Sequence, residues 1–179
     1  MTRKVKKVLV YGYGNPGRLD DGLGPVFAEK IKELQLEGVT ADSNYQLVVE
    51  DSAEIAKHDV VIFVDADTEC PEPFHFERVI AKEHMSFSSH SISADALMAM
   101  AENLMGSKAE AYMLGIRGYE FNEYEERLSE DATRNLNKAI LFIKEALTDY
   151  NFEKYLNRYS TKKTGNDYCA PHSVQIERG

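Results

Sequence analysis

Residues 59–65 form the clearest strand in the sequence, because Val60, Val61, Ile62, Phe63 and Val64 follow one another without a polar residue. A strand that is apolar on both faces must be covered on both sides, as happens when helices pack on each face of a mostly parallel sheet. We therefore place this strand at the centre of a sheet that lies between two layers of helices.

The other elements alternate around this central strand. Residues 8–11 predict a strand that ends in a glycine-rich turn at residues 12–17, and a helical pattern opens at Pro25. Further strands are expected at residues 45–49, 74–80 and 111–116, and further helices at residues 52–57, 93–104 and 129–147. Helix-length connections between neighbouring strands require crossovers on the sheet faces, so the order predicts an α/β fold, a three-layer α/β/α sandwich with five strands.

The length of 179 residues fits one domain with a sizeable core. We expect this domain to span residues 1–149. Residues 150–179 carry five basic and three acidic side chains and show no amphipathic period, whereas the net charge of the whole chain is −9. They predict a C-terminal tail that is flexible or docks on a partner.

The overall charge excludes one class of partner, because a net charge of −9 repels a phosphate backbone. We expect no nucleic acid. The apolar stretches are far shorter than the roughly 18 residues of a membrane span, and the basic N-terminus lacks a signal-peptide pattern. Cys70 and Cys169 have no metal-ligand spacing. These features predict a cytoplasmic chain without a membrane span, and a short acidic domain of this kind is expected to be a monomer.

The turn after the first strand matches the Gly-x-Gly-x-x-Gly pattern of dinucleotide-binding folds, with glycines at positions 12, 14 and 17. Two features argue against a dinucleotide. Pro16 stiffens the loop, and Asp20 and Asp21 would place two negative charges where a pyrophosphate should lie.

Acidic side chains follow each of the first three predicted strands. The pairs are Asp20 with Asp21, Glu50 with Asp51, and Asp65 with Asp67. Because the carboxyl ends of parallel strands meet at one edge of a sheet, we expect these pairs to share a rim. Carboxylates gathered without cationic partners repel one another unless a proton or a metal ion relieves the repulsion. The sequence therefore predicts a cation site at this rim.

His90 is the best candidate for a nitrogen ligand, because it lies in a serine-rich polar loop just ahead of a helix. The residues alone leave other roles open: Asp21 could cap a helix, Asp65 could fix a turn, and His90 could be a solvated loop residue. The strings His-Glu-x-x-His and Gly-x-Ser-x-Gly do not occur, which excludes the zinc proteases and serine hydrolases that carry them.

Four segments together resemble the hydrogenase maturation proteases, the endopeptidases that trim the large subunit of nickel-iron hydrogenases. They are the turn and acidic pair at residues 12–25, the strand end at 61–66, the histidine loop at 88–90 and the segment at 114–119. The resemblance covers residues 7–147. It implies a mixed sheet, in which one antiparallel strand lies among parallel ones.

The resemblance also implies a metal site. Carried over residue by residue, the ligands are Asp21, Asp65 and His90, and the metal is a divalent ion, nickel carried by the substrate. Two carboxylates and one imidazole leave coordination positions open and are compatible with nickel, or with zinc as a surrogate.

The implied function is removal of the C-terminal extension of a nickel-iron hydrogenase large-subunit precursor after nickel insertion. Gly12, Gly14 and Asn15 shape the turn at the site, and Asp51 is the candidate general base. Attack by a metal-bound water and attack by a water that a carboxylate activates both stay open. A second hypothesis is a nickel-sensing chaperone that binds the immature subunit without cutting it. Peptidyl-tRNA hydrolases share the string Gly-Asn-Pro-Gly, but they need a histidine shortly after the turn and a basic face, and this chain has neither.

Overall fold

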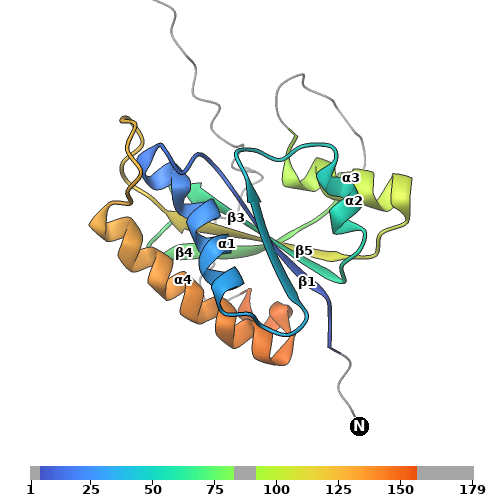
Figure 1. Ribbon diagram of the computed structural model, residues 1–179. Helices are drawn as coiled ribbons and strands as arrows, with labels where there is room; N and C mark the ends of the chain where they lie inside the picture. Colours follow the sequence, from blue (N-terminus) through green and yellow to red (C-terminus); the bar gives the residue numbers. More distant parts are fainter. Residues whose placement is uncertain (1–4, 83–91, 157–179) are drawn as a thin grey trace, which may run out of the picture.

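The computed structural model describes residues 5–82 and 92–156 and contains a five-stranded sheet (Figure 1). The strands lie in the order β2-β1-β3-β5-β4. Their bounds are β1 Val8–Tyr13, β2 Val39–Asn44, β3 Val60–Asp67, β4 Phe74–Val79 and β5 Glu110–Arg117. Neighbouring strands are parallel except for β4, which is antiparallel to β5. The mostly parallel, mixed sheet with β3 at its centre is therefore confirmed.

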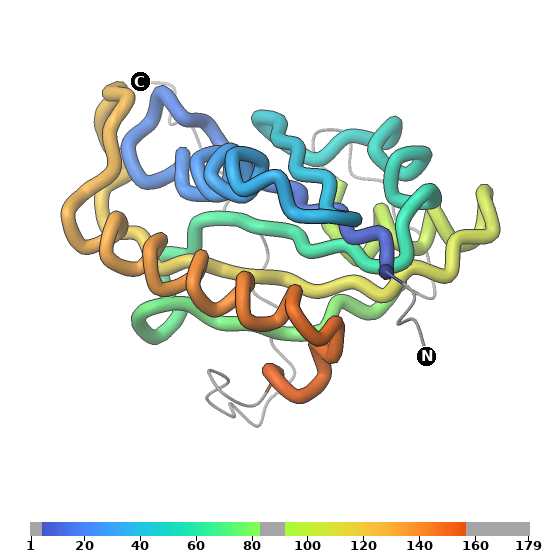
Figure 2. The backbone as a smooth tube through the Cα atoms, turned by 60° about the horizontal axis from the view of Figure 1, so that its bottom comes forward, coloured from blue at the N-terminus to red at the C-terminus, as the bar shows by residue number. Residues whose placement is uncertain are grey.

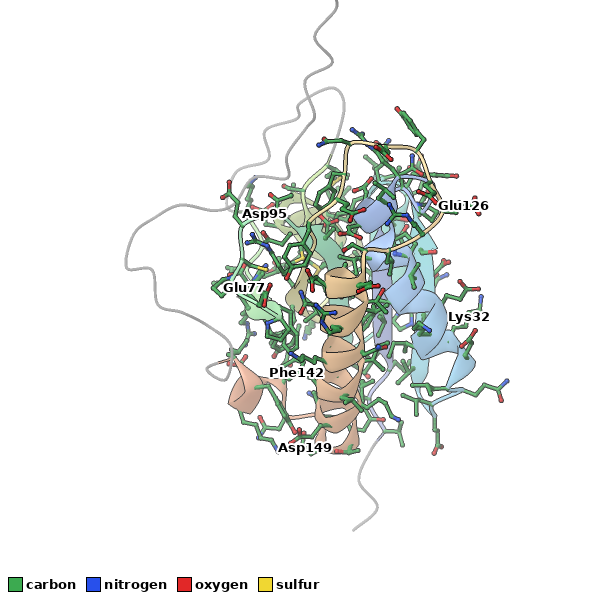
Figure 3. The ribbon with its side chains drawn as sticks, turned by 90° about the vertical axis from the view of Figure 1, so that its left-hand side faces the viewer. Lys32, Glu77, Asp95, Glu126, Phe142 and Asp149 are labelled. Carbon is green, nitrogen blue, oxygen red and sulfur yellow. The ribbon has the colours of Figure 1, made fainter. Side chains whose placement is uncertain are left out.

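Helices cover both faces of this sheet and complete the three layers. One face carries α1 (Leu23–Glu33) and α4 (Glu130–Asp149), which lie side by side (Figure 3). Helix α4 runs along β5 (Figure 2). The other face carries α2 (Asp51–Ile55) and α3 (Ala94–Met105). Two short 3-10 turns, η1 (Leu19–Gly22) and η2 (Phe152–Tyr155), flank α1 and α4.

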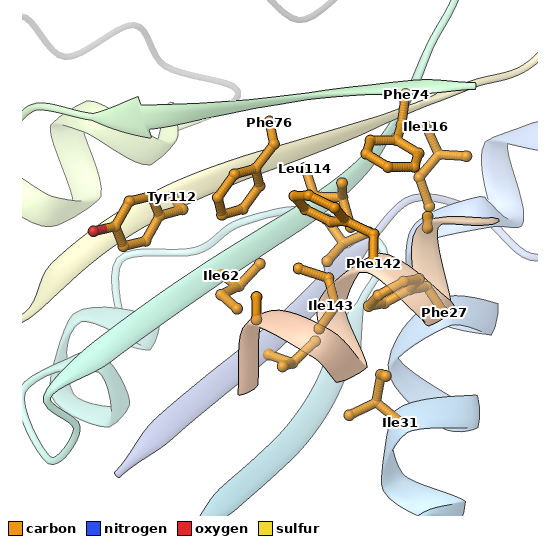
Figure 4. Packing of buried hydrophobic residues seen from close by; sticks show 14 of the residues in the cluster. Phe27, Ile31, Ile62, Phe74, Phe76, Tyr112, Leu114, Ile116, Phe142 and Ile143 are labelled. Carbon is orange, nitrogen blue, oxygen red and sulfur yellow. The ribbon is translucent and has the colours of Figure 1, made fainter. Parts of the chain in front are cut away.

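Strand β3 is buried on both faces because each face meets a helical layer. Ile62 and Val64 point into the core beneath α1 and α4, where Ile62 lies next to Ile143 (Figure 4). Phe63 points to the opposite side, toward α2 and α3. Successive side chains of a strand alternate between the faces, so a run without polar residues is what this position requires.

The second strand differs from the sequence prediction, which placed it at residues 45–49. Strand β2 lies at Val39–Asn44 and pairs only with β1, so it is an edge strand with an exposed, polar outer side. Tyr45 and Val49 are 68% and 47% exposed, and only Leu47 of that segment enters the core. The prediction was wrong because it relied on apolar composition, which marks buried strands. An edge strand such as β2 buries few side chains and can therefore be mostly polar.

Helix α4 begins where the sequence predicts, since the Ser129 hydroxyl accepts a hydrogen bond from the Ala132 N–H and caps the helix. The packed domain reaches further than residue 149, however. In η2, Phe152 and Tyr155 are each 1% exposed, and the Phe152 ring packs 5.3 Å from that of Tyr112. Residues 150–156 therefore belong to the domain and not to the expected tail.

Helix α4 is the longest described helix, with 20 residues, but charged and polar side chains line one side of it. Among the helices of the described residues, none combines the length and the apolar composition needed to cross a membrane.

Candidate functional site at the carboxyl edge of the sheet

The glycine-rich turn after β1 brings two backbone segments into direct contact. A Cβ atom at Gly12 would overlap the carbonyl oxygen of Gly24 at the start of α1, and one at Gly14 would overlap the carbonyl oxygen of Asp21. Gly14 also has φ = 135°, which disfavours any other residue. The absence of side chains at these positions lets η1 and the start of α1 pack against β1 and β3.

This packing fixes Asp21 at the edge of the sheet. The Asn15 N–H donates a hydrogen bond to Asp21 Oδ2 over 3.0 Å, and the Asn15 side-chain oxygen accepts one from the Gly17 N–H over 2.9 Å. Asn15 thus closes its own turn with its side chain and holds the neighbouring carboxylate with its backbone. The Asp21 side chain is half-buried.

Asp65 lies at the end of β3 and is close to Asp21. Burial, together with the negative charges of Asp21 and Asp67, raises the pKa of Asp65 to about 7, although a hydrogen bond from the Ala66 N–H opposes the rise. The structure therefore brings together Asp21 and Asp65, two of the three expected metal ligands.

Asp20, the neighbour of Asp21, faces the interior instead. Its side chain is fully buried and accepts hydrogen bonds from the Tyr119 N–H, the Glu120 N–H and both the N–H and the hydroxyl of Ser129, over 2.7–2.9 Å. Asp20 therefore anchors η1 to the segment before α4. Of this acidic pair, Asp20 therefore has a structural role, whereas Asp21 lies at the candidate site.

Asp51, the candidate general base, opens α2 and does not end a strand as expected. Its carboxylate accepts hydrogen bonds from the Tyr11 hydroxyl and the Val48 N–H, each over 2.8 Å. Burial, together with this bond to Asp51, raises the pKa of Tyr11. In the described part of the chain, no hydrogen bond connects Asp51 to Asp21 or Asp65.

A histidine that the sequence analysis did not select lies on the same face of the sheet as Asp65. His75 of β4 pairs with Gly115 of β5, which in turn pairs with Asp65, and its Nε2 is 3.1 Å from Asp67 Oδ2. Burial opposes ionisation of Asp67, but hydrogen bonds from His75 and from two backbone N–H groups lower its pKa to about 2. The available signal was Gly115, since a glycine inside a strand often marks a close approach.

We expect Gly115→Ala to lower the free energy of unfolding by about 1–3 kcal/mol. The added Cβ would overlap the imidazole of His75, which must then leave Asp67. Urea unfolding measures the change, and His75→Ala provides the matched background because it removes the overlapping ring. An equal cost of Gly115→Ala in both backgrounds would contradict the explanation.

The donors at this edge fit a divalent cation. Two carboxylates repel each other here, and a cation would remove that repulsion. Within residues 5–82 and 92–156, no group of three histidine, cysteine or acidic side chains is arranged to hold a metal ion. A metal ion held by Asp21 and Asp65 would need a further ligand, and the third expected ligand, His90, lies outside the described residues.

Comparison with solved structures finds proteins of the same fold. The [NiFe] hydrogenase maturation protease HycI from Thermococcus kodakarensis KOD1 superposes with a TM-score of 0.63 and 25% sequence identity, over 80% of this chain and 93% of the protease. The resemblance to the hydrogenase maturation proteases is confirmed. No family model matches the sequence, and no curated protein matches it.

Two further hydrogenase maturation proteases share the fold. The endopeptidase HybD from E. coli has a TM-score of 0.65 and 17% identity, over 81% of this chain and 94% of HybD. A hydrogenase 2 maturation peptidase from a Thaumarchaeota archaeon has a TM-score of 0.59 and 21% identity, over 80% of this chain and 99% of the peptidase. The shared architecture thus spans nearly the whole of each protease.

Proposed function

We propose that this chain is an endopeptidase that removes the C-terminal extension of a nickel-iron hydrogenase large subunit after nickel insertion. The observation that carries the proposal is the pairing of Asp21 with Asp65 at the carboxyl edge of a fold shared with hydrogenase maturation proteases. A pair of carboxylates without a cationic partner favours a bound cation. In this proposal the cation is the nickel ion of the substrate.

Recognition of nickel would use Asp21, Asp65 and His90. Two carboxylates and one imidazole leave positions free for ligands from the large subunit, so one ion can be shared between the two proteins. Zinc accepts the same donor types and is therefore a useful surrogate in binding measurements.

In the cleavage step, water adds to the carbonyl carbon of the scissile peptide bond, the C–N bond breaks, and the released amine takes up a proton. A general base assists by accepting a proton from the attacking water. Asp51 is our candidate for this base. The side chains of Tyr11 and Tyr13 leave β1 on one face and reach Asp51 and Asp65 respectively, which supports a location of Asp51 on the metal-binding side of the sheet.

One observation favours the alternative of a nickel-sensing chaperone that does not cut. The Asp51 carboxylate already accepts hydrogen bonds from the Tyr11 hydroxyl at Oδ1 and from the Val48 N–H at Oδ2. Both oxygens of the candidate base therefore have a donor before any water is bound. The same Asp21 and Asp65 would serve recognition in both functions.

The intact mass of a large-subunit precursor distinguishes the two functions. The precursor is incubated with the full chain, with and without its nickel. We expect a nickel-dependent loss of a C-terminal peptide. An unchanged mass in a mixture where complex formation is demonstrated would overturn the protease assignment and favour the chaperone.

Asp51→Asn is expected to reduce turnover of the precursor by about 100-fold or more and to leave binding unchanged, because the amide cannot accept a proton. The rate comes from the intact mass over time, and binding comes from a separate titration. Asp42→Asn, on the exposed side of edge strand β2, is the matched control. Cleavage by Asp51→Asn at the wild-type rate would exclude Asp51 as the base.

A further inference from the structure

Strand β4 lies at one edge of the sheet and, among the described strands, pairs only with β5. The Arg117 N–H donates to the Pro73 carbonyl, which shows that the odd-numbered residues of β4 form the hydrogen-bonded pairs of this antiparallel ladder. The backbone groups of the residues between them therefore point away from the sheet. Within residues 5–82 and 92–156, the N–H groups of Phe76 and Arg78 have no acceptor.

The opposite edge of the sheet, at β2, is closed by its own side chains. The Asn44 carbonyl accepts a hydrogen bond from the Gly14 N–H, so the neighbouring Ser43 directs its N–H outward. That N–H donates to Asp42 Oδ1, and the Tyr45 N–H just beyond the strand donates to Asn44 Oδ1, each over 2.8 Å. A row of unpaired backbone groups accepts a further strand, and folded proteins usually cover it. Of the two edges, β4 is the one open to another strand.

A groove of about 360 Å³ adjoins this open edge. Residues 78–81 at the end of β4 form one wall, and α3 and the segment before β5 form the others. Its lining includes the apolar side chains of Val79, Ile80, Met98 and Ala109, and Ile80 is 69% exposed. A strand added to β4 would lie beside this groove and direct alternate side chains toward it.

The described part of the chain ends beside the same edge. Glu153 of η2 forms an ion pair with Arg78, and Arg78 also lines the groove. The buried rings of Phe152 and Tyr155 hold η2 in this place. Residue 156, the last one described, therefore follows closely after the contact with β4.

The sequence beyond residue 156 contains a short pattern that fits an edge strand. Although the C-terminal region shows no amphipathic period as a whole, residues 173–177 alternate, since Val174 and Ile176 are apolar and their neighbours are polar. Such alternation is typical of a strand that is covered on one face. Residues 157–172 can span up to about 50 Å when extended, which is enough to connect η2 with β4.

We propose that residues 173–177 add to the outer edge of β4 as a sixth strand, with Val174 and Ile176 over the groove. The outward N–H groups of β4 then gain acceptors, and the exposed apolar lining of the groove is covered. A segment tethered by residues 157–172 meets this edge at an effective concentration on the order of millimolar, which favours it over a separate peptide or a second copy. The inference is independent of the proposed function, because it involves neither Asp21 nor Asp65.

Hydrogen exchange of the full chain, resolved by residue with NMR, tests the added strand. Wild type is compared with a double variant, Val174→Pro with Ile176→Pro, because proline cannot donate to a strand ladder. We expect the N–H groups of Phe76 and Arg78 to exchange about 10-fold faster or more in the double variant. Thr164→Pro is the matched control, since it places a proline in the connecting residues and should leave this exchange within about twofold of wild type.

The N–H groups of His75 and Glu77 show whether β4 stays paired, because they point toward β5. Faster exchange of these two groups as well would show a loosening of the whole strand and would overturn the proposal. Equal exchange of Phe76 and Arg78 in wild type and double variant would also overturn it. Protection that falls on dilution of the wild-type chain, together with a dimer in light scattering, would assign the edge to a second copy instead.

Discussion

Asp20→Ala is expected to lower the free energy of unfolding by about 3–5 kcal/mol. The side chain is fully buried and accepts four hydrogen bonds, from the backbone of Tyr119 and Glu120 and from the backbone and hydroxyl of Ser129. Alanine leaves these donors in the interior without an acceptor, and each buried donor without a partner costs about 1–3 kcal/mol. Urea unfolding followed by circular dichroism measures the loss.

Asp21→Ala is the matched comparison for stability, because it removes the neighbouring carboxylate of the same turn. Asp21 is half-buried and accepts one backbone hydrogen bond, from Asn15, so its loss should cost about 1 kcal/mol. Equal destabilisation by the two variants would contradict the division of this acidic pair into a structural and a site residue.

Asp21→Asn should reduce nickel-dependent processing of the precursor by about 100-fold or more, equivalent to about 2.7 kcal/mol of lost transition-state stabilisation. The amide oxygen can still accept the hydrogen bond from the Asn15 N–H, so the turn keeps its shape. The negative charge beside Asp65 is lost, and with it one of the two carboxylates that we propose bind nickel.

Intact-mass analysis of nickel-loaded precursor measures this effect, with Asp42→Asn as the control for the loss of one negative charge on an exposed strand. Unfolding of the variant is followed in parallel, so that a loss of activity is not mistaken for a loss of fold. Processing by Asp21→Asn at the rate of Asp42→Asn would exclude Asp21 from the site.

The layers of the fold could be predicted from the sequence because burial dictates composition most strongly at the centre. Strand β3 must be apolar on both faces, and it was located to within two residues. Edge strand β2 was missed because its outer side faces solvent, so Val39–Asn44 resembles a polar loop. A strand must be apolar only on those sides that neighbouring helices or strands cover, so only buried strands can be recognised by their composition.

The site could be predicted only in part, for a related reason. The rule that parallel strands end at one edge was enough to bring Asp21 and Asp65 together. It could not separate Asp21 from Asp20, because the direction of the Asp20 side chain is set by Ser129, 109 residues away. The positions of Tyr13 and His75 depend on strand register, which the sequence pattern does not specify.

The anchorage of Asp20 to Ser129 has a consequence for the order in which the molecule assembles. Asp20, in the same turn as Asp21, is held by Ser129 at the start of α4, 109 residues further along the chain. The turn can be anchored only when the chain between them closes into a loop. The entropy cost of closing this loop must be met before the contact can stabilise the turn. A chain still emerging from the ribosome would therefore lack an anchored turn until Ser129 has been synthesised, and Asp21 would have no fixed place beside Asp65 before then.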